Sequence, residues 1–177
     1  MDMKKSAKVA LSGVLCALSV VIMLTAYFPY LTYAIPAIAG ALLTVIAIEI
    51  DKKWAFGAYI VSALLTLLLC EKEAASLYVC FFGYYTIVKG IIEARFRGIV
   101  EYILKYLIFN LSIVIGYLLV VYVFGIPFEE AGMSGWIFAV GLLVAGNVVF
   151  YIYDRGLDRV IAAYIHLMHP KIRRMFK

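Results

Sequence analysis

Charged residues are scarce in this chain of 177 residues. They make up 15% of it, against 66% hydrophobic residues, and the mean hydropathy is +1.02. A water-soluble domain carries about a quarter charged and about half apolar residues. The composition therefore excludes an ordinary soluble domain and predicts a single domain whose main solvent is lipid.

Cysteine and histidine are also few. Cys16, Cys70 and Cys80 are odd in number and lie in apolar runs, which favours buried thiols over a disulfide framework. His166 and His169 have a metal-compatible spacing, but no third ligand is near them in the sequence, so we expect no metal site. No Ser-His-Asp set or paired-carboxylate set stands out, and the phosphate-binding G-x-x-x-x-G-K-[ST] motif is missing. We therefore expect no catalytic residues, no cofactor and no nucleotide hydrolysis by this chain.

Long apolar runs dominate what is present. Each is long enough to cross a bilayer, which takes roughly 17 to 25 residues. The runs do not alternate between polar and apolar residues, so they predict helices and not strands of a barrel. We expect an all-α integral membrane protein, a compact bundle of six transmembrane helices in which sequential helices are antiparallel neighbours. The expected helices are 9–28, 31–50, 54–70, 74–92, 102–124 and 135–153, in a transmembrane domain of residues 1–153.

The distribution of charge predicts the orientation. Lysines and arginines precede the first run, follow the second, fourth and sixth, and so share one side of a six-helix topology. The other side carries one cation, Lys72, and four acids, Glu71, Glu73, Glu129 and Glu130. By the positive-inside rule, the chain is a multi-pass protein of the cell membrane with both termini cytoplasmic. The net charge of +5 then reflects topology and attraction to the lipid bilayer, not nucleic-acid binding.

A few charges lie inside or next to the apolar runs. Lys89 and Lys105 are near the cytoplasmic ends of their helices, where long side chains can snorkel to the interface. Glu101 lies four residues before Lys105, a spacing that predicts an ion pair. Asp154 and Asp158 follow the sixth run among arginines, and we expect ion pairs there as well.

The tail, residues 154–177, is basic and has apolar residues at helical spacing. This pattern predicts an amphipathic helix on the cytoplasmic leaflet. An extension of the sixth helix and a contact with a cytoplasmic partner are the open alternatives.

Aromatic and charged side chains gather in three loops on the outer side. Singly, they are typical of interfacial aromatics and of wet turns. Together they also suit the rim of a binding site. The candidates on these loops are Tyr27, Tyr30, Tyr33, Glu71, Lys72, Glu73, Glu130 and Trp136.

Polar atoms lie below this surface, within the helices. Tyr78 and Tyr85 share one face of the fourth helix, Asn110 lies in the fifth and Asn147 in the sixth. An amide in a bilayer must face protein, water or a ligand. Two interpretations stay open: hydrogen bonding between helices, or an outward-open cavity among helices four to six. Aromatic walls with a few polar groups suit a small, partly flat organic ligand.

The first helix carries small residues at spacings of four, three and four, namely Ser6, Ala10, Gly13 and Ala17. Small residues let another helix approach closely in lipid. The stripe therefore predicts packing against this chain's own helices or docking of another membrane subunit.

The chain resembles the substrate-binding (S) components of energy-coupling factor (ECF) transporters, which are six-helix vitamin-uptake proteins. The resemblance lies in the small-residue stripe, the chain length, the number of helices and their predicted orientation. In that family an Ala-x-x-x-Ala face of the first helix contacts the transmembrane coupling subunit. Gly13-Val14-Leu15-Cys16-Ala17 is the nearest match here, and Ala10 extends it.

The resemblance implies a membrane subunit that captures a vitamin-like metabolite from the outer side and topples in the membrane when partner ATPases in the cytoplasm drive the coupling subunit. The loop after the first helix would gate the site. Two other function classes remain open: a non-catalytic scaffold of a cell-envelope assembly complex, and a membrane-embedded enzyme that uses the outer carboxylates. The implied substrate-binding residues are Tyr27, Tyr30, Tyr33, Glu71, Lys72, Glu73, Tyr78, Tyr85, Asn110, Glu130, Trp136 and Asn147, and the implied partner-interface residues are Ala10, Gly13 and Ala17.

Overall fold

The computed structural model describes residues 3–28, 31–118 and 135–175 of the chain. About 90% of this part is helical and none of it is in a strand, so the prediction of an all-helical protein is confirmed. The elements in chain order are α1 (Lys5–Leu24), the 3₁₀ turn η1 (Thr25–Tyr27), α2 (Ala34–Glu49), α3 (Lys52–Leu69), α4 (Lys72–Leu77), the π-helical turn η2 (Tyr78–Phe82), α5 (Gly83–Arg95), α6 (Ile99–Leu118), α7 (Gly135–Leu167) and α8 (His169–Met175).

Four of the described helical segments are long and apolar enough to cross a membrane: Lys5–Tyr27, Lys52–Leu69, Lys72–Arg95 and Ile99–Gly116. The α2 helix is apolar but shorter. Large apolar side chains cover the outer faces of these helices; Leu68, for example, is 80% exposed. Soluble monomers rarely expose large continuous apolar surfaces, so these faces fit contact with lipid.

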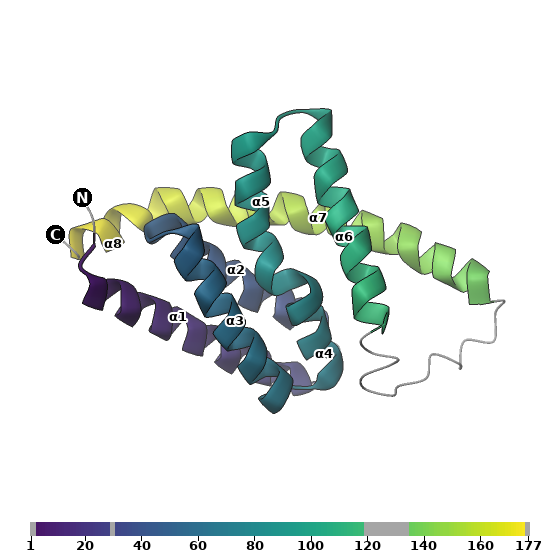
Figure 1. Ribbon diagram of the computed structural model, residues 1–177, viewed down its shortest axis with the longest axis horizontal. Coiled ribbons are helices and arrows are strands. Elements are labelled where there is room, and N and C mark those ends of the chain that lie inside the picture. Colours follow the sequence, from purple (N-terminus) through teal and green to yellow (C-terminus); the bar gives the residue numbers. More distant parts are fainter. Residues whose placement is uncertain (1–2, 29–30, 119–134, 176–177) are drawn as a thin grey trace.

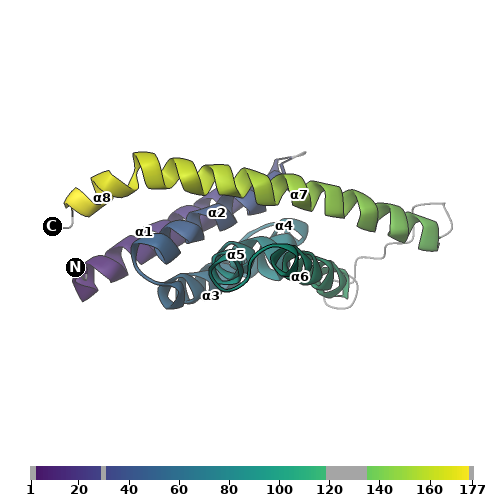
Figure 2. The same ribbon diagram turned by 90° about the horizontal axis from the view of Figure 1, so that it is seen from above.

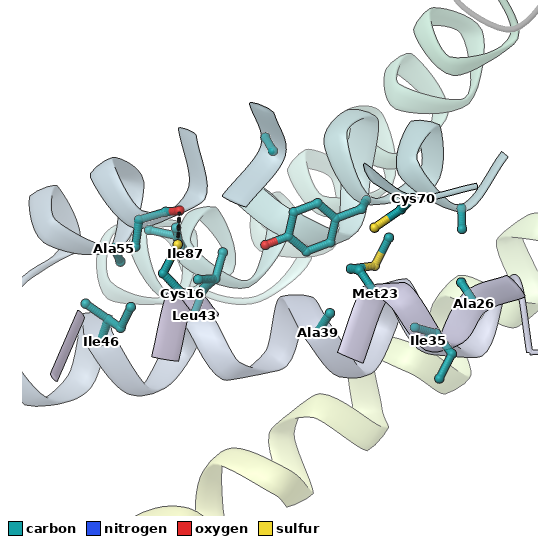
Figure 3. Packing of buried hydrophobic residues seen from close by; sticks show 14 residues of the cluster. Cys16, Met23, Ala26, Ile35, Ala39, Leu43, Ile46, Ala55, Cys70 and Ile87 are labelled. Carbon is teal, nitrogen blue, oxygen red and sulfur yellow. Dashed lines mark hydrogen bonds between the residues drawn. The ribbon is translucent and has the colours of Figure 1, made fainter. Parts of the chain in front are cut away.

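The first core lies among α1, α2, α3 and the start of the fourth span. Met23, Ala39, Leu43 and Ile46 are fully buried there, and Figure 3 shows them between the helices with Cys16 beside Leu43. The Cys16 thiol donates to the carbonyl oxygen of Ala58, with 3.6 Å between Sγ and O, and so links α1 to α3. The small residues of α2 let its neighbours approach closely, and α2 packs against α1, α3 and α5, behind α3 in the view of Figure 1.

The expected fourth helix, 74–92, is observed as the continuous segment Lys72–Arg95, with the π-helical turn η2 in its first half. The turn lies against α2 at Gly40, where an added Cβ would collide with the carbonyl oxygen of Phe82. Gly40 also accepts a hydrogen bond at its carbonyl from the Thr86 hydroxyl, at 3.2 Å. A residue without a side chain is therefore required at this crossing.

The α7 helix is continuous over 33 residues. It runs the length of the molecule and crosses α5 and α6, and in the second view it lies in its own layer (Figures 1 and 2). The contacts between α6 and α7 run in opposite order along the two helices, Lys105 with Asp154 and Asn110 with Asn147. These two helices are therefore antiparallel neighbours, as expected, and they cross at an angle (Figure 1). No break separates residues 135–153 from the beginning of the tail, so the first 14 residues of the tail continue the sixth helix to Leu167.

The second core joins α7 to the π-turn and α5. Phe81, Tyr85, Phe150 and Leu157 are its buried members. Beyond this aromatic core, the contacts that fix α7 are mostly polar, and they form the candidate site described next.

Candidate functional site: a buried charge network and an exposed face of the first helix

The loop after α1, which the sequence predicts to be on the outer side, has exposed aromatic rings. Tyr27 is 61% and Tyr33 68% exposed. The Tyr27 hydroxyl donates to the carbonyl oxygen of Leu69 at 3.1 Å, which ties the end of α1 to the end of α3. Tyr30 lies outside the described residues. The rings of Tyr27 and Tyr33, two residues of the expected binding-site rim, are therefore accessible.

The charged turn before α4 is a helix cap. The Glu71 carboxylate accepts hydrogen bonds from the backbone N–H groups of Glu73, at 3.2 Å, and Ala74, at 3.1 Å. These are two of the donors that the first turn of a helix leaves unpaired. The side chains of Lys72 and Glu73 are exposed. Glu71 therefore has a structural role at this turn, and Glu73 is the carboxylate that faces outward.

Tyr78 is fully buried and joins three elements. Its hydroxyl lies 3.1 Å from Ser19 Oγ on α1 and 2.7 Å from Ser62 Oγ on α3. Ser19 also donates to the carbonyl oxygen of Ala39 on α2, at 3.1 Å. Tyr78 therefore forms hydrogen bonds between helices, the first of the two interpretations of the buried polar groups.

Tyr85 is likewise fully buried. Its hydroxyl donates to Asp154 Oδ1 at 2.6 Å, and its ring stacks on Phe81 with the centroids 4.6 Å apart. Neighbouring rings of η2, α6 and α7 pack around this pair, with centroids 5.1 to 6.1 Å from those of Phe81 or Tyr85. A ligand beside Tyr85 would need these rings to separate.

Asp154 is the centre of a buried network of charges. Lys89, whose side chain is 0% exposed, contacts Asp154 Oδ1 through its ammonium group and donates to the Asp154 carbonyl oxygen at 3.0 Å. The same ammonium lies 2.8 Å from Asp158 Oδ1 and 3.2 Å from Glu93 Oε1. One lysine of α5 thus holds two consecutive turns of α7.

A second lysine enters the network from α6. The ammonium of Lys105, whose side chain is 3% exposed, lies 2.6 Å from Glu93 Oε1, 2.8 Å from Glu101 Oε1 and 3.4 Å from Asp154 Oδ2. The predicted pair of Glu101 and Lys105 is confirmed. Glu93 and Asp154 each contact both lysines, so α5, α6 and α7 meet in a single network.

The prediction that Lys89 and Lys105 snorkel to the interface is wrong, because both are buried and point at carboxylates of other helices. Asp154 and Asp158 form ion pairs as expected, but the structure pairs them with lysines. The neighbouring Arg155 instead donates to the Tyr102 hydroxyl at 3.1 Å.

The two asparagines of the expected site meet directly. Asn110 Nδ2 donates to Asn147 Oδ1, and Asn147 Nδ2 donates to Asn110 Oδ1, both at 3.1 Å. Each amide also donates to the carbonyl oxygen four residues earlier in its own helix, Tyr106 or Leu143, in a second hydrogen bond. The pair links α6 to α7 and satisfies both amides without a ligand.

The end of α7 is fastened to α2 by one carboxylate. Glu49 Oε1 accepts from the Tyr164 hydroxyl at 2.7 Å and lies 2.7 Å from His169 Nδ1. Burial, together with the nearby Glu49 carboxylate, raises the pKa of Tyr164 above its usual range. The tail therefore contacts the end of α2 that the sequence predicts to be cytoplasmic. The side chains of Leu167 and Met168 remain exposed.

The small-residue stripe of α1 faces outward. Ala10, Gly13 and Ala17 are all exposed, and no heavy atom lies within 4 Å of a Cβ placed on Gly13. These residues are not packed against the chain's own helices. The structure therefore does not show the stripe packed against the chain's own helices, which was one of its two interpretations.

Next to the stripe, a groove with a volume of about 560 Å³ runs between α1 and α3. Ser12, Gly13 and Cys16 line it from α1, and Lys53 and Gly57 line it from α3. Ser12 is buried, yet its Oγ has no hydrogen-bond partner among the residues that the structure describes.

Besides Tyr30, two expected site residues are not placed. Glu130 lies outside the described residues, and the side chain of Trp136, at the beginning of α7, is not described. Within the described ranges, no group of three His, Cys, Asp or Glu side chains could hold a metal ion.

Sequence reasoning missed the centre of this site, the network around Asp154. The signal was present: two lysines inside apolar runs need partners, because an unpaired charge in lipid is costly. Asp154 and Asp158 follow the sixth run on the same predicted side of the membrane. Matching the two lysines to these carboxylates by depth would have named them as candidate partners, but which groups meet depends on how α7 crosses α5.

Comparison of the chain with protein-family models, with curated proteins and with solved structures finds no match.

Proposed function

We propose that the chain is a membrane-embedded substrate-capture subunit that works with partner subunits, similar to the S component of an ECF transporter. In this proposal it crosses the cell membrane six times with both termini in the cytoplasm. It binds a small vitamin-like metabolite from the outer side and has no enzymatic activity itself. A transmembrane coupling subunit and cytoplasmic ATPases supply the energy for uptake.

The observation that carries the proposal is the exposure of the α1 stripe. Ala10, Gly13 and Ala17 form a face without bulky side chains that the chain leaves uncovered. Lipid gains nothing from small residues, whereas a partner helix gains close backbone contact. Such a face therefore supports docking of a second membrane protein.

Two further features fit this proposal. Tyr27 and Tyr33 remain exposed at the opposite end of the first helix, where a ligand from outside would arrive. Residues 140–152 of α7 expose apolar side chains such as Val144, Val148 and Ile152, as a sixth span in lipid would.

A specific observation also favours the second function, a non-catalytic scaffold in a cell-envelope complex. Tyr78, Tyr85, Asn110 and Asn147, four of the expected ligand contacts, already have protein partners. A scaffold needs the docking face of α1 but no ligand cavity.

The deciding experiment combines ligand screening and partner capture. Purified chain in mild detergent is heated with each member of a panel of vitamins and related metabolites. The transport proposal expects one compound to raise the melting temperature, and Tyr33→Ala to reduce that rise. A panel without a hit, together with stable capture of cell-wall assembly proteins, would favour the scaffold.

Partner capture is tested with the stripe itself. Ala10→Leu and Ala17→Leu are expected to abolish co-purification of a membrane partner from native membranes without lowering thermal stability. Ala163→Leu is the matched control, an exposed alanine elsewhere, on α7. Unchanged capture by both stripe variants would overturn the role assigned to α1.

A further inference from the structure

The groove between α1 and α3 has the size of a binding site. Its volume of about 560 Å³ falls within the range of about 300–1,000 Å³ for small-molecule sites. Apolar side chains such as Val9 and Val61 form its walls. Its ligand must therefore be largely apolar.

Two glycines keep the groove open. Gly13 on α1 and Gly57 on α3 both line it, and no heavy atom lies within 4 Å of a Cβ placed on either. Larger side chains at these positions would meet no other part of the fold and would project into open space. The packing of the chain itself therefore does not require glycine at either position.

A polar group lies in this apolar wall. Ser12 lines the groove, is 8% exposed, and its Oγ has no hydrogen-bond partner in the described part of the chain. An unmatched buried hydroxyl carries a desolvation cost. The oxygen itself is covered by protein atoms, so Ser12 contributes no polar contact to the groove.

Positive charge marks one end of the groove. Lys53 lines it at the beginning of α3, and Lys5 begins α1 at the same end of the molecule (Figure 1). With a helical rise of about 1.5 Å per residue, Lys53 lies roughly 6 Å from the level of Gly57, and Lys5 roughly 10 Å from that of Ser12. Trp54, an aromatic residue of the kind found at membrane interfaces, also lines this end.

The groove is therefore apolar along its walls and cationic at one end. A glycerophospholipid combines the same two features, an anionic phosphate and apolar acyl chains. We propose that the groove binds one anionic glycerophospholipid from the leaflet on the side of the N-terminus. Its phosphate lies beside Lys53, and an acyl chain lies along Gly13 and Gly57.

A lipid fits these observations better than a protein helix does. A helix with its side chains is about 10–12 Å wide and would have to supply a carboxylate for Lys53 at a fixed height. A phospholipid brings an anionic phosphate together with a narrow acyl chain. The inference depends on the membrane location of the chain and is independent of the proposed transport function.

The test is native mass spectrometry of the full chain released from detergent. Phosphatidylglycerol or phosphatidylcholine with the same acyl chains is added to separate samples. The wild type is expected to retain one phosphatidylglycerol, with about five-fold weaker binding of phosphatidylcholine, the size of effect expected for one lysine near a phosphate. Gly57→Leu is expected to reduce binding of both lipids by about ten-fold, and Lys53→Gln to remove only the preference between them.

Gly141→Leu is the matched control, because Gly141 is also helical, exposed and free of heavy atoms within 4 Å of an added Cβ. It should bind lipid as the wild type does. Circular dichroism checks that each variant is folded, and if Gly57→Leu fails that check, Lys53→Gln decides.

Three results would overturn the proposal: no lipid retained by the wild type, equal retention by Gly57→Leu, or an undiminished phosphatidylglycerol preference in Lys53→Gln. A dimer or a partner complex that Gly57→Leu breaks while lipid binding persists would assign the groove to a protein instead. Ala10 and Ala17 do not line the groove. Loss of lipid and loss of the transport partner are therefore separately measurable.

Discussion

Lys89 and Asp154 are 65 residues apart in the sequence, and the lysine ammonium donates both to the aspartate side chain and, at 3.0 Å, to its backbone carbonyl oxygen. The contact joins the fourth predicted span to α7. It lies beside the aromatic core around Phe81 and Phe150, so both charged and aromatic contacts attach α7 to the other helices.

Removal of Lys89 should destabilise the protein more than removal of any one of its acidic partners. The network sets two lysine ammonium groups, those of Lys89 and Lys105, against four carboxylates. Lys89→Met raises this negative excess, and breaking a buried ion pair costs about 3–5 kcal/mol. The free energy of unfolding is measured by titration from mild detergent into sodium dodecyl sulfate, with α-helical circular dichroism as the readout.

Asp158→Asn provides the comparison, because the side chain of Asp158 is 42% exposed and exposed pairs contribute about 0–1 kcal/mol. A double variant, Lys89→Met with Asp154→Met, should be more stable than the sum of the two single changes predicts. Equal losses for Lys89→Met and Asp158→Asn would show that the network does not hold α7.

The asparagine pair makes a second, smaller contribution. Asn110→Leu should lower the free energy of unfolding by about 0.6–2 kcal/mol, the range found for hydrogen bonds between membrane helices. Asn110→Leu combined with Asn147→Leu should cost less than the sum of the single changes, because neither amide is then left unpaired. If Asn110 instead binds a ligand, its replacement would leave stability unchanged and abolish the ligand-induced rise in melting temperature.

Helix positions could be predicted from the sequence because long apolar runs have few other solutions in lipid. The predicted span 74–92 and the observed segment Lys72–Arg95 differ only at their ends. Partner choice could not be predicted in the same way. Whether Lys89 snorkels or turns inward depends on where Asp154 lies, and that depends on the crossing of α7, which leaves no trace in hydropathy.

The same limit applies to the candidate site. The pattern of residue types identified Tyr78, Tyr85, Asn110 and Asn147 as polar groups that need partners, and the structure gives each of them one within the protein. The sequence left open whether the partner is a ligand or a helix. For Ala10 and its neighbours the ambiguity was between internal packing and docking, and exposure decides against internal packing.

The role of the charged turn can be tested by a matched pair of substitutions. Glu71→Ala removes the acceptor of two backbone N–H groups, and loss of a helix N-cap costs about 0.5–2 kcal/mol. Glu73→Ala removes a neighbouring carboxylate whose side chain is exposed and should change the free energy of unfolding by less than about 0.5 kcal/mol. The same detergent titration measures both, and a larger loss for Glu73→Ala would contradict the cap assignment.

The crossing of α2 and the π-turn should be intolerant of even one methyl group. Gly40→Ala places a Cβ against the backbone carbonyl of Phe82, and backbone cannot rotate away as a side chain can. Overpacking of this kind costs about 1–3 kcal/mol, which outweighs the gain in helix propensity of about 1 kcal/mol from replacing glycine with alanine. Gly90→Ala makes the same chemical change on α5, where no heavy atom lies within 4 Å of the added Cβ, so it should leave stability unchanged or raise it. Unfolding in detergent compares the two, and because only the steric surroundings differ, a Gly40→Ala variant as stable as Gly90→Ala would show that α2 and the π-turn are not in close contact.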